Sequence, residues 1–144
     1  MGVDSYCSRQ YGYAPRGVRL HGLVPGRAFD RVSIVAAKCG DRVVERHEYP
    51  GFMNSRLFEF WFMLLLKVIP NGSVIIMDNA SWHRKKVLRE MARLAMCRII
   101  FLPPYSPDFN KIEKLWANLK AFLRNYMANF NLLSDAFLAF FQGG

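Results

Sequence analysis

"SVIIMDNASWHRKKVLREMARLAMCRIIFL", residues 73–102, contains the pattern that best indicates the fold class. Residues 73–77 form a short apolar run of the kind that is buried on both faces of a sheet, and residues 98–102 form a second predicted strand. Between the two strands, residues 84–96 carry an apolar stripe at helical spacing, made by Val87, Leu88, Met91, Leu94 and Ala95. Strand, helix and strand in this order indicate an α/β fold.

The segments around this unit predict a mixed sheet flanked by helices. Residues 31–37 and 42–49 are β-branched and partly alternating, and Cys39-Gly40-Asp41 supplies the reversal of a hairpin. Helices are predicted over residues 54–68, from about residue 111, and over residues 132–141, the last one stopping at a Gln-Gly-Gly end. The first 29 residues are rich in Gly, Pro, Tyr and Arg, so we expect irregular chain with one short strand near residues 18–23.

Composition narrows the class of protein. A chain of 144 residues is expected to form one domain, and its net charge of +9 favours a polyanionic partner such as nucleic acid, although a basic protein without such a partner has the same charge. Three widely spaced cysteines argue against a zinc site or a disulfide framework. The longest apolar run, residues 60–66, is too short to cross a membrane, and no secretory signal is visible. We therefore expect an intracellular protein that is located in the cytoplasm.

Two carboxylates are candidates for one site. Asp78 ends a predicted strand, and Glu113 opens the helix after the next strand, so both are expected at the same edge of the sheet, where ligands gather. Paired carboxylates there suit a hard divalent cation such as Mg²⁺. The alternatives are a turn role for Asp78 and a helix-cap role for Glu113 with Asn110. Asp108 is the rival second carboxylate.

A row of basic residues lies on the helix between the two strands. Four-residue spacing aligns three of them and a fourth lies beside the row: Lys85, Lys86, Arg89 and Arg93. The row is either a solvated helix face or a surface that binds DNA phosphates. His83, five residues after Asp78, is either a surface residue at the start of this helix or a neighbour of the site.

"VIIMDNASWHRKK" and "RIIFLPPYSPDFNKIEKLWANLK" closely resemble the catalytic domain of bacterial insertion-sequence transposases in the Tc/mariner superfamily. That family has an Asp-Asn block after a strand and a Pro-Pro-Tyr-Ser-Pro loop leading to a Glu; here 34 residues separate Asp78 from Glu113, the family's characteristic gap. "RQYGYAPRG" and "LFEFWF" extend the resemblance over nearly the whole chain.

The resemblance implies a ribonuclease H-like fold in which three carboxylates bind two divalent metal ions, Mg²⁺ or Mn²⁺, for DNA strand cleavage and transfer. Asp78 would be the second acid and Glu113 the third, with Asn79, His83 and Asn110 in supporting positions. The implied partner is DNA, both the terminal repeats of the element and its target, and a homodimer is an assembly that the resemblance allows. We expect "RQYGYAPRG" and "PPYSPDFN" to brace the site, with Arg9 and Arg16 as DNA contacts.

Two departures from the family pattern shape the expected activity. Lys111 replaces the family's Pro at the start of the helix, and the motif with the first Asp would fall about three residues before Gly2, outside the chain. Asp4 is the nearest substitute, and we expect it in a loop. Residues 1–144 are thus predicted to be a partial catalytic domain without the helix-turn-helix region and with the first strand largely missing. Apolar faces should be poorly covered and catalysis impaired.

Two alternatives to an impaired catalytic domain stay open. The chain could be a non-catalytic DNA-binding remnant that grips phosphates with the basic row. It could also be the C-terminal part of a longer transposase that is produced by frameshifting.

Overall fold

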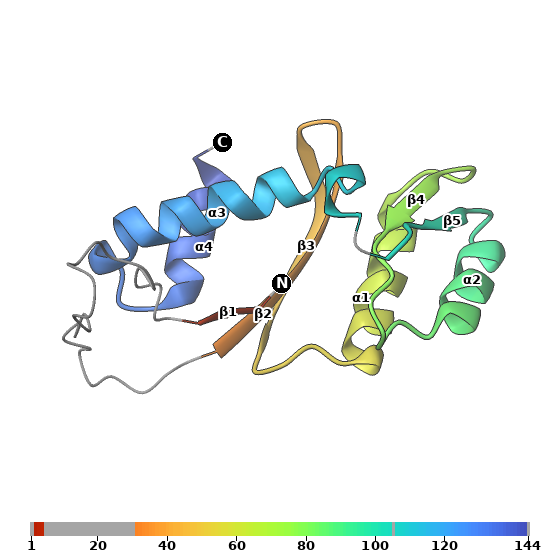
Figure 1. Ribbon diagram of the computed structural model, residues 1–144, viewed down its shortest axis with the longest axis horizontal. Helices are drawn as coiled ribbons and strands as arrows, with labels where there is room; N and C mark the ends of the chain where they lie inside the picture. The colour runs from red at the N-terminus through yellow and green to blue at the C-terminus, as the bar shows by residue number, and fades with distance from the viewer. Residues whose placement is uncertain (1, 5–30, 105, 144) are drawn as a thin grey trace, which may run out of the picture.

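The structure is a computed structural model that describes residues 2–4, 31–104 and 106–143 (Figure 1). Its first sheet is antiparallel with the order β1-β2-β3, formed by Gly2–Asp4, Arg31–Cys39 and Arg42–Pro50. The β2–β3 hairpin reverses at Gly40, whose φ of 60° is a left-handed value that glycine adopts at little cost. This confirms the predicted hairpin, whereas the predicted strand near residues 18–23 lies outside the described residues.

The second sheet is the predicted strand–helix–strand unit. Helix α1 (Ser55–Val68) precedes β4 (Val74–Met77), and α2 (Lys85–Leu94) connects β4 to its parallel partner β5 (Arg98–Phe101). Asn54 caps α1, because its side-chain oxygen accepts a 3.0 Å hydrogen bond from the Leu57 N–H. Met96, with a φ of 57°, marks the turn from α2 into β5.

Two further helices complete the described chain. A 3-10 helix (Pro107–Phe109) precedes α3 (Glu113–Tyr126), and a second 3-10 helix (Met127–Asn129) separates α3 from α4 (Leu133–Gln142). Helix α3 begins two residues later than predicted, at the candidate carboxylate itself. Residues 111 and 112 form a turn, which agrees with the loss of a proline that would preset the helical φ angle.

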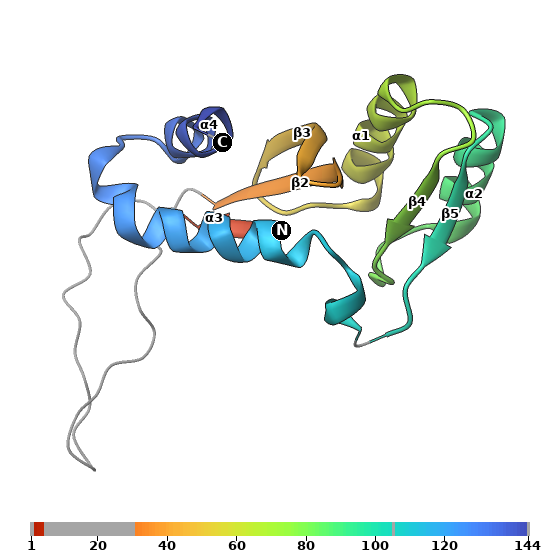
Figure 2. The same ribbon diagram turned by 90° about the horizontal axis from the view of Figure 1, so that it is seen from above.

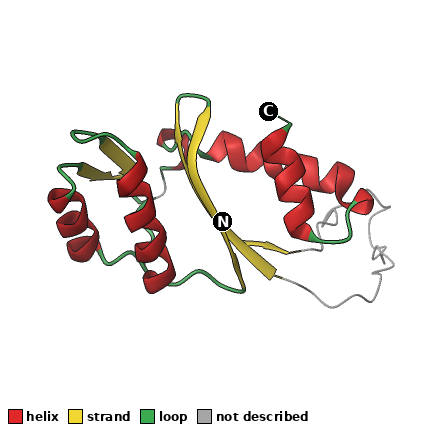
Figure 3. Ribbon diagram, turned by 180° about the vertical axis from the view of Figure 1, so that it is seen from behind, coloured by secondary structure: helices red, strands yellow, loops and turns green. Residues whose placement is uncertain are grey.

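Two apolar clusters cover opposite faces of the hairpin. Helices α3 and α4 pack on one face through the buried residues Ile34, Ala36, Trp116, Leu119, Leu123, Leu133, Ala136 and Phe137. On the other face, α1 lies between the hairpin and the β4–β5 pair (Figure 2), where it shares a core with Tyr49, Met77, Leu88, Ala92 and Cys97. The two sheets are therefore joined through α1, and the strands form two groups (Figure 3).

This arrangement confirms the α/β class with helices flanking the strands. The prediction that residues 73–77 are buried on both faces is wrong, because Val74 and Ile76 are 53% and 55% exposed while Met77 is 9% exposed. Core packing covers only the Met77 side, and no described strand pairs with the outer edge of β4. Ile100 on β5 is also half-exposed, so one apolar face of this sheet is largely uncovered among the described residues.

The position of Asp4 differs from the prediction. Asp4 does not lie in a loop but ends β1, opposite Arg31, since antiparallel pairing with β2 extends to it. Within the described part of the chain, no helix has the length and apolar character needed to cross a bilayer.

Candidate metal and DNA site

The site begins where the parallel strands end. Both β4 and β5 run to the same side of the molecule, and the segment toward α3 leaves from that side (Figure 2). The Leu102 N–H donates a 2.8 Å hydrogen bond to the Met77 carbonyl, which continues the strand pairing by one step. Asp78 follows directly, with a side chain that is 63% exposed. The buried end of β4 thus presents a carboxylate at the rim of the core.

A cavity of about 260 Å³ lies at this rim. It is lined by residues that follow β4, by the loop after β5 and by the first residue of α3: Asp78, Asn79, Ala80, Leu102, Pro103, Pro104, Ser106, Asn110 and Glu113. The structure therefore brings Asp78 and Glu113 to one cavity, together with the two asparagines that were predicted to support them. Ser106 was not singled out in the sequence, although it belongs to the "PPYSPDFN" loop that was expected to brace the site.

The rival assignments of these carboxylates find little support among the described residues. Asn110 accepts a hydrogen bond from the Ile112 N–H at 3.4 Å through its side chain, and its backbone carbonyl accepts one from the Glu113 N–H at 3.0 Å. No described contact joins the Glu113 carboxylate to Asn110 or the Asp78 carboxylate to Ser81, as a capping box and a turn role would require. Asp108 is exposed in the 3-10 helix and does not line the cavity.

His83 is buried beside the site, so its placement as a surface residue is wrong. Its ring lies 4.4 Å from Phe58 and 4.2 Å from Trp82, measured between ring centroids. Nδ1 is 3.3 Å from the Asp78 carbonyl oxygen and 3.6 Å from the Asp78 carboxylate. Burial lowers the pKa of His83 below its ordinary value, and the opposing effect of Asp78 is smaller. The ring is therefore neutral at pH 7.

The basic row on α2 divides into two parts. Lys85 Nζ and the Arg89 guanidinium lie 5.4 and 5.0 Å from the ring centroid of Phe101, the last residue of β5, so both are next to the loop that lines the cavity. Lys86 is exposed. Arg93 instead pairs with Glu90 through two hydrogen bonds of 3.0 and 2.6 Å, and this carboxylate offsets its charge.

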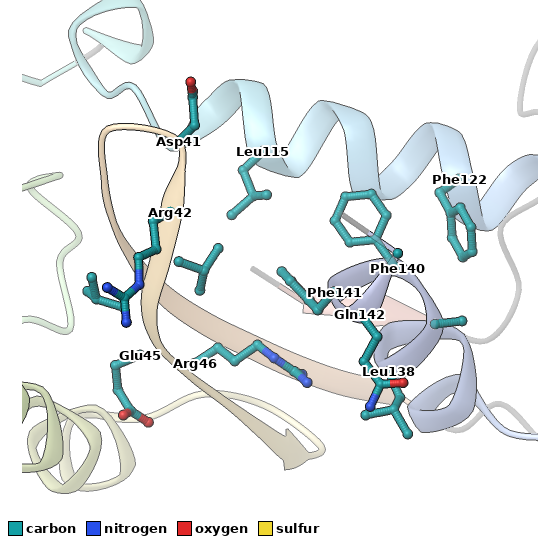
Figure 4. A pocket seen from close by; sticks show the side chains of 14 residues that line it. Asp41, Arg42, Glu45, Arg46, Leu115, Phe122, Leu138, Phe140, Phe141 and Gln142 are labelled. Carbon is teal, nitrogen blue, oxygen red and sulfur yellow. The ribbon is translucent and has the colours of Figure 1, made fainter.

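A larger cavity of about 830 Å³ lies between β3 and helices α3 and α4 (Figure 4). Its lining is mostly apolar, and Arg46 is engaged there, with its guanidinium 4.4 Å from the Phe141 ring centroid and 2.7 Å from Glu48. The acidic residues Asp41 and Glu45 lie at separate ends of it (Figure 4). Although this cavity is the larger of the two, we do not assign it as the metal site, because its two acidic residues do not lie together.

Comparison with protein families identifies the family of the chain. The model of the DDE superfamily endonuclease family matches residues 1–134. The chain belongs to this family. A comparison with curated proteins found no match.

Members of the DDE endonuclease superfamily act on DNA with divalent metal ions, and the family match agrees with the predicted ribonuclease H-like fold. The donors at the cavity fit such an ion, because carboxylate, amide and hydroxyl oxygens are the ligands that Mg²⁺ and Mn²⁺ prefer. Among the described residues, no group of three or more His, Cys, Asp or Glu side chains is placed to hold a metal ion. The roles of Asp78 and Glu113 as metal ligands stay predictions.

Proposed function

We propose that Asp78 and Glu113 are metal-binding catalytic carboxylates of a transposase that cleaves and joins DNA strands. The observation that carries this proposal is their shared cavity, in which every polar lining side chain is a carboxylate, an amide or a hydroxyl and carries an oxygen. Neither carboxylate is engaged by a described Lys or Arg, so their charge is available for a cation. A divalent ion held there would activate a water or hydroxyl and stabilise the charge of the leaving oxygen.

The other residues of the site have positioning roles in this proposal. Pro103 and Pro104 restrict the backbone of the loop that carries the site from β5 toward α3. Asn110 holds the start of α3 through its two hydrogen bonds, and this fixes where Glu113 enters the cavity wall. Asn79 adds an amide next to Asp78 on the same wall.

DNA is the proposed substrate, in the form of element ends and target. The DNA phosphates would be contacted by three basic residues of α2: Lys85, Lys86 and Arg89. Two of them, Lys85 and Arg89, lie over the ring of Phe101, which directly precedes the loop that lines the cavity. The basic charge of the whole chain supports the same partner. A purely DNA-binding role without catalysis is the second candidate, and the same row supports it.

Metal binding by the 144-residue chain tests the site. Mn²⁺ titrations followed by electron paramagnetic resonance should show that Asp78→Asn and Glu113→Gln each weaken binding about tenfold or more, since each removes one anionic ligand. Asp108→Asn is the matched control, because this carboxylate lies in the same loop region but does not line the cavity. Equal affinities for all four proteins would refute the site.

Catalysis by this chain is proposed to be weak, because two carboxylates leave each of two metal ions with few fixed ligands. Nicking assays on plasmid and terminal-repeat DNA with Mg²⁺ or Mn²⁺ should give little product. Robust nicking that is lost in Asp78→Asn and Glu113→Gln would contradict the weak activity while supporting the site. DNA binding that needs no metal and survives both substitutions would favour the second candidate.

A further inference from the structure

His83 is the polar residue most enclosed by the core near the site. Its side chain is only 2% exposed, and aromatic rings from three segments surround it. These rings belong to Phe58 of α1, to Trp82 in the turn before α2, and to Phe101 of β5, whose ring centroid is 6.5 Å from that of His83. Its backbone is also held, because the His83 N–H donates to the Ala80 carbonyl at 3.1 Å. The ring therefore has a fixed place from which it can hold another group.

The two ring nitrogens have different surroundings. Nδ1 is 3.3 Å from the Asp78 carbonyl oxygen, which can only accept a hydrogen bond, so Nδ1 carries the hydrogen. Nε2 is buried without a hydrogen-bond partner among the described residues. A proton on Nε2 as well would place an unpaired donor and a charge inside an aromatic enclosure, which is costly. The favoured form is thus the neutral ring with its hydrogen on Nδ1.

Hydrogen bonds hold both peptide planes that flank the Cα of Asp78. The plane before it is held by Leu102, whose N–H donates to the Met77 carbonyl at 2.8 Å. The plane after it contains the Asp78 carbonyl that faces His83 Nδ1. Fixing both planes fixes the direction of the Cα–Cβ bond, and this matters because the carboxylate itself is largely exposed.

We propose that His83 is a positioning residue whose Nδ1–H holds the Asp78 carbonyl and thereby directs the Asp78 carboxylate toward the cavity. The consequence for metal affinity rests on the proposed function of Asp78. The hydrogen bond and the fixed backbone do not depend on it, so they can be measured without metal.

Two substitutions separate the hydrogen bond from the packing of the ring. His83→Asn keeps an N–H donor on the atom that corresponds to Nδ1, whereas His83→Leu fills space without a donor. His47→Asn is the matched control, because this histidine lies on β3 and contacts Tyr49 at 4.8 Å, away from the cavity.

Nitrogen-15 NMR of the metal-free parent chain should show a neutral His83 ring with hydrogen on Nδ1. The Asn79 amide shares a peptide plane with the Asp78 carbonyl, so its order parameter reports how firmly that plane is held. Relaxation measurements should give this amide an order parameter of about 0.85 in the parent and in His83→Asn, and of about 0.6 in His83→Leu. An Nε2–H tautomer would overturn the proposal. So would equal order parameters in the two His83 variants.

Mn²⁺ affinity then reports the consequence for the site. We expect His83→Leu to weaken Mn²⁺ binding about tenfold, and His83→Asn and His47→Asn to stay within about threefold of the parent, since positioning groups behind a ligand typically have effects of this size. If Asp78→Asn leaves Mn²⁺ binding unchanged, the proposed function fails, while the tautomer and the order parameters still decide the role of His83.

Discussion

The salt dependence of DNA binding provides a quantitative test of the basic row. Each phosphate that a protein cation neutralises adds about 0.9 to the slope of log K against log salt. Lys85, Lys86 and Arg89 are free of described acidic partners, whereas Glu90 offsets the charge of Arg93. The structure therefore predicts three effective contacts rather than four.

Three contacts give a slope of about −2.7, which corresponds to an affinity loss of about 40-fold between roughly 50 and 200 mM salt. Arg89→Ala should reduce the slope to about −1.8 and the loss to about 12-fold. Arg93→Ala should leave the slope nearly unchanged. Fluorescence anisotropy with a short labelled duplex measures the DNA affinity of the parent chain and of both variants over this salt range.

Arg98→Ala is the control for the loss of one exposed positive charge outside the basic row. Arg98 begins β5, the strand after α2, at the end away from the cavity. Its slope should match that of the parent chain. The reasoning is refuted if Arg93→Ala lowers the slope as much as Arg89→Ala does, or if Arg89→Ala has no effect. Either result would mean that the row does not bind phosphates in the way its contacts indicate.

Three further predictions concern folding stability, each measured by urea denaturation. Leu88→Ala should lower the free energy of unfolding by about 2–5 kcal/mol because Leu88 is fully buried, whereas Leu94→Ala, at a 71% exposed residue of the same helix, should cost less than about 0.5 kcal/mol; equal costs would contradict the placement of α2. Ile76→Thr should cost less than about 1 kcal/mol and Met77→Ala about 2 kcal/mol or more, and the reverse order would mean that β4 faces the other way. The pKa of His83 is lower in the folded chain than the ordinary 6.5, so the unfolded chain binds more protons at mildly acidic pH, and stability should fall as the pH drops below about 6.5. His83→Asn should flatten that dependence, and an unchanged pH profile in this variant would exclude His83 as its source.

The local elements and their order follow from the amino-acid sequence alone. Apolar spacing and breakers are properties of neighbouring residues, so the hairpin, the helices and both parallel strands were predicted close to their observed bounds. The same local logic placed Asp78 at the end of a strand and Glu113 at the start of α3, and their shared cavity agrees with that placement. The family motifs, being short and contiguous, were also readable without a structure.

Which apolar faces are buried and which charged side chains are paired depends on the tertiary structure. The apolar run of β4 predicts burial on both sides, but whether Ile76 is covered depends on which elements pack against it. Arg93 looks equivalent to Arg89 in sequence, yet the rotamer of Glu90 pairs with one and leaves the other over Phe101. His83 is buried because α1 and β5, distant in sequence, supply the rings around it. Burial and pairing depend on contacts between remote segments, and local spacing does not encode them.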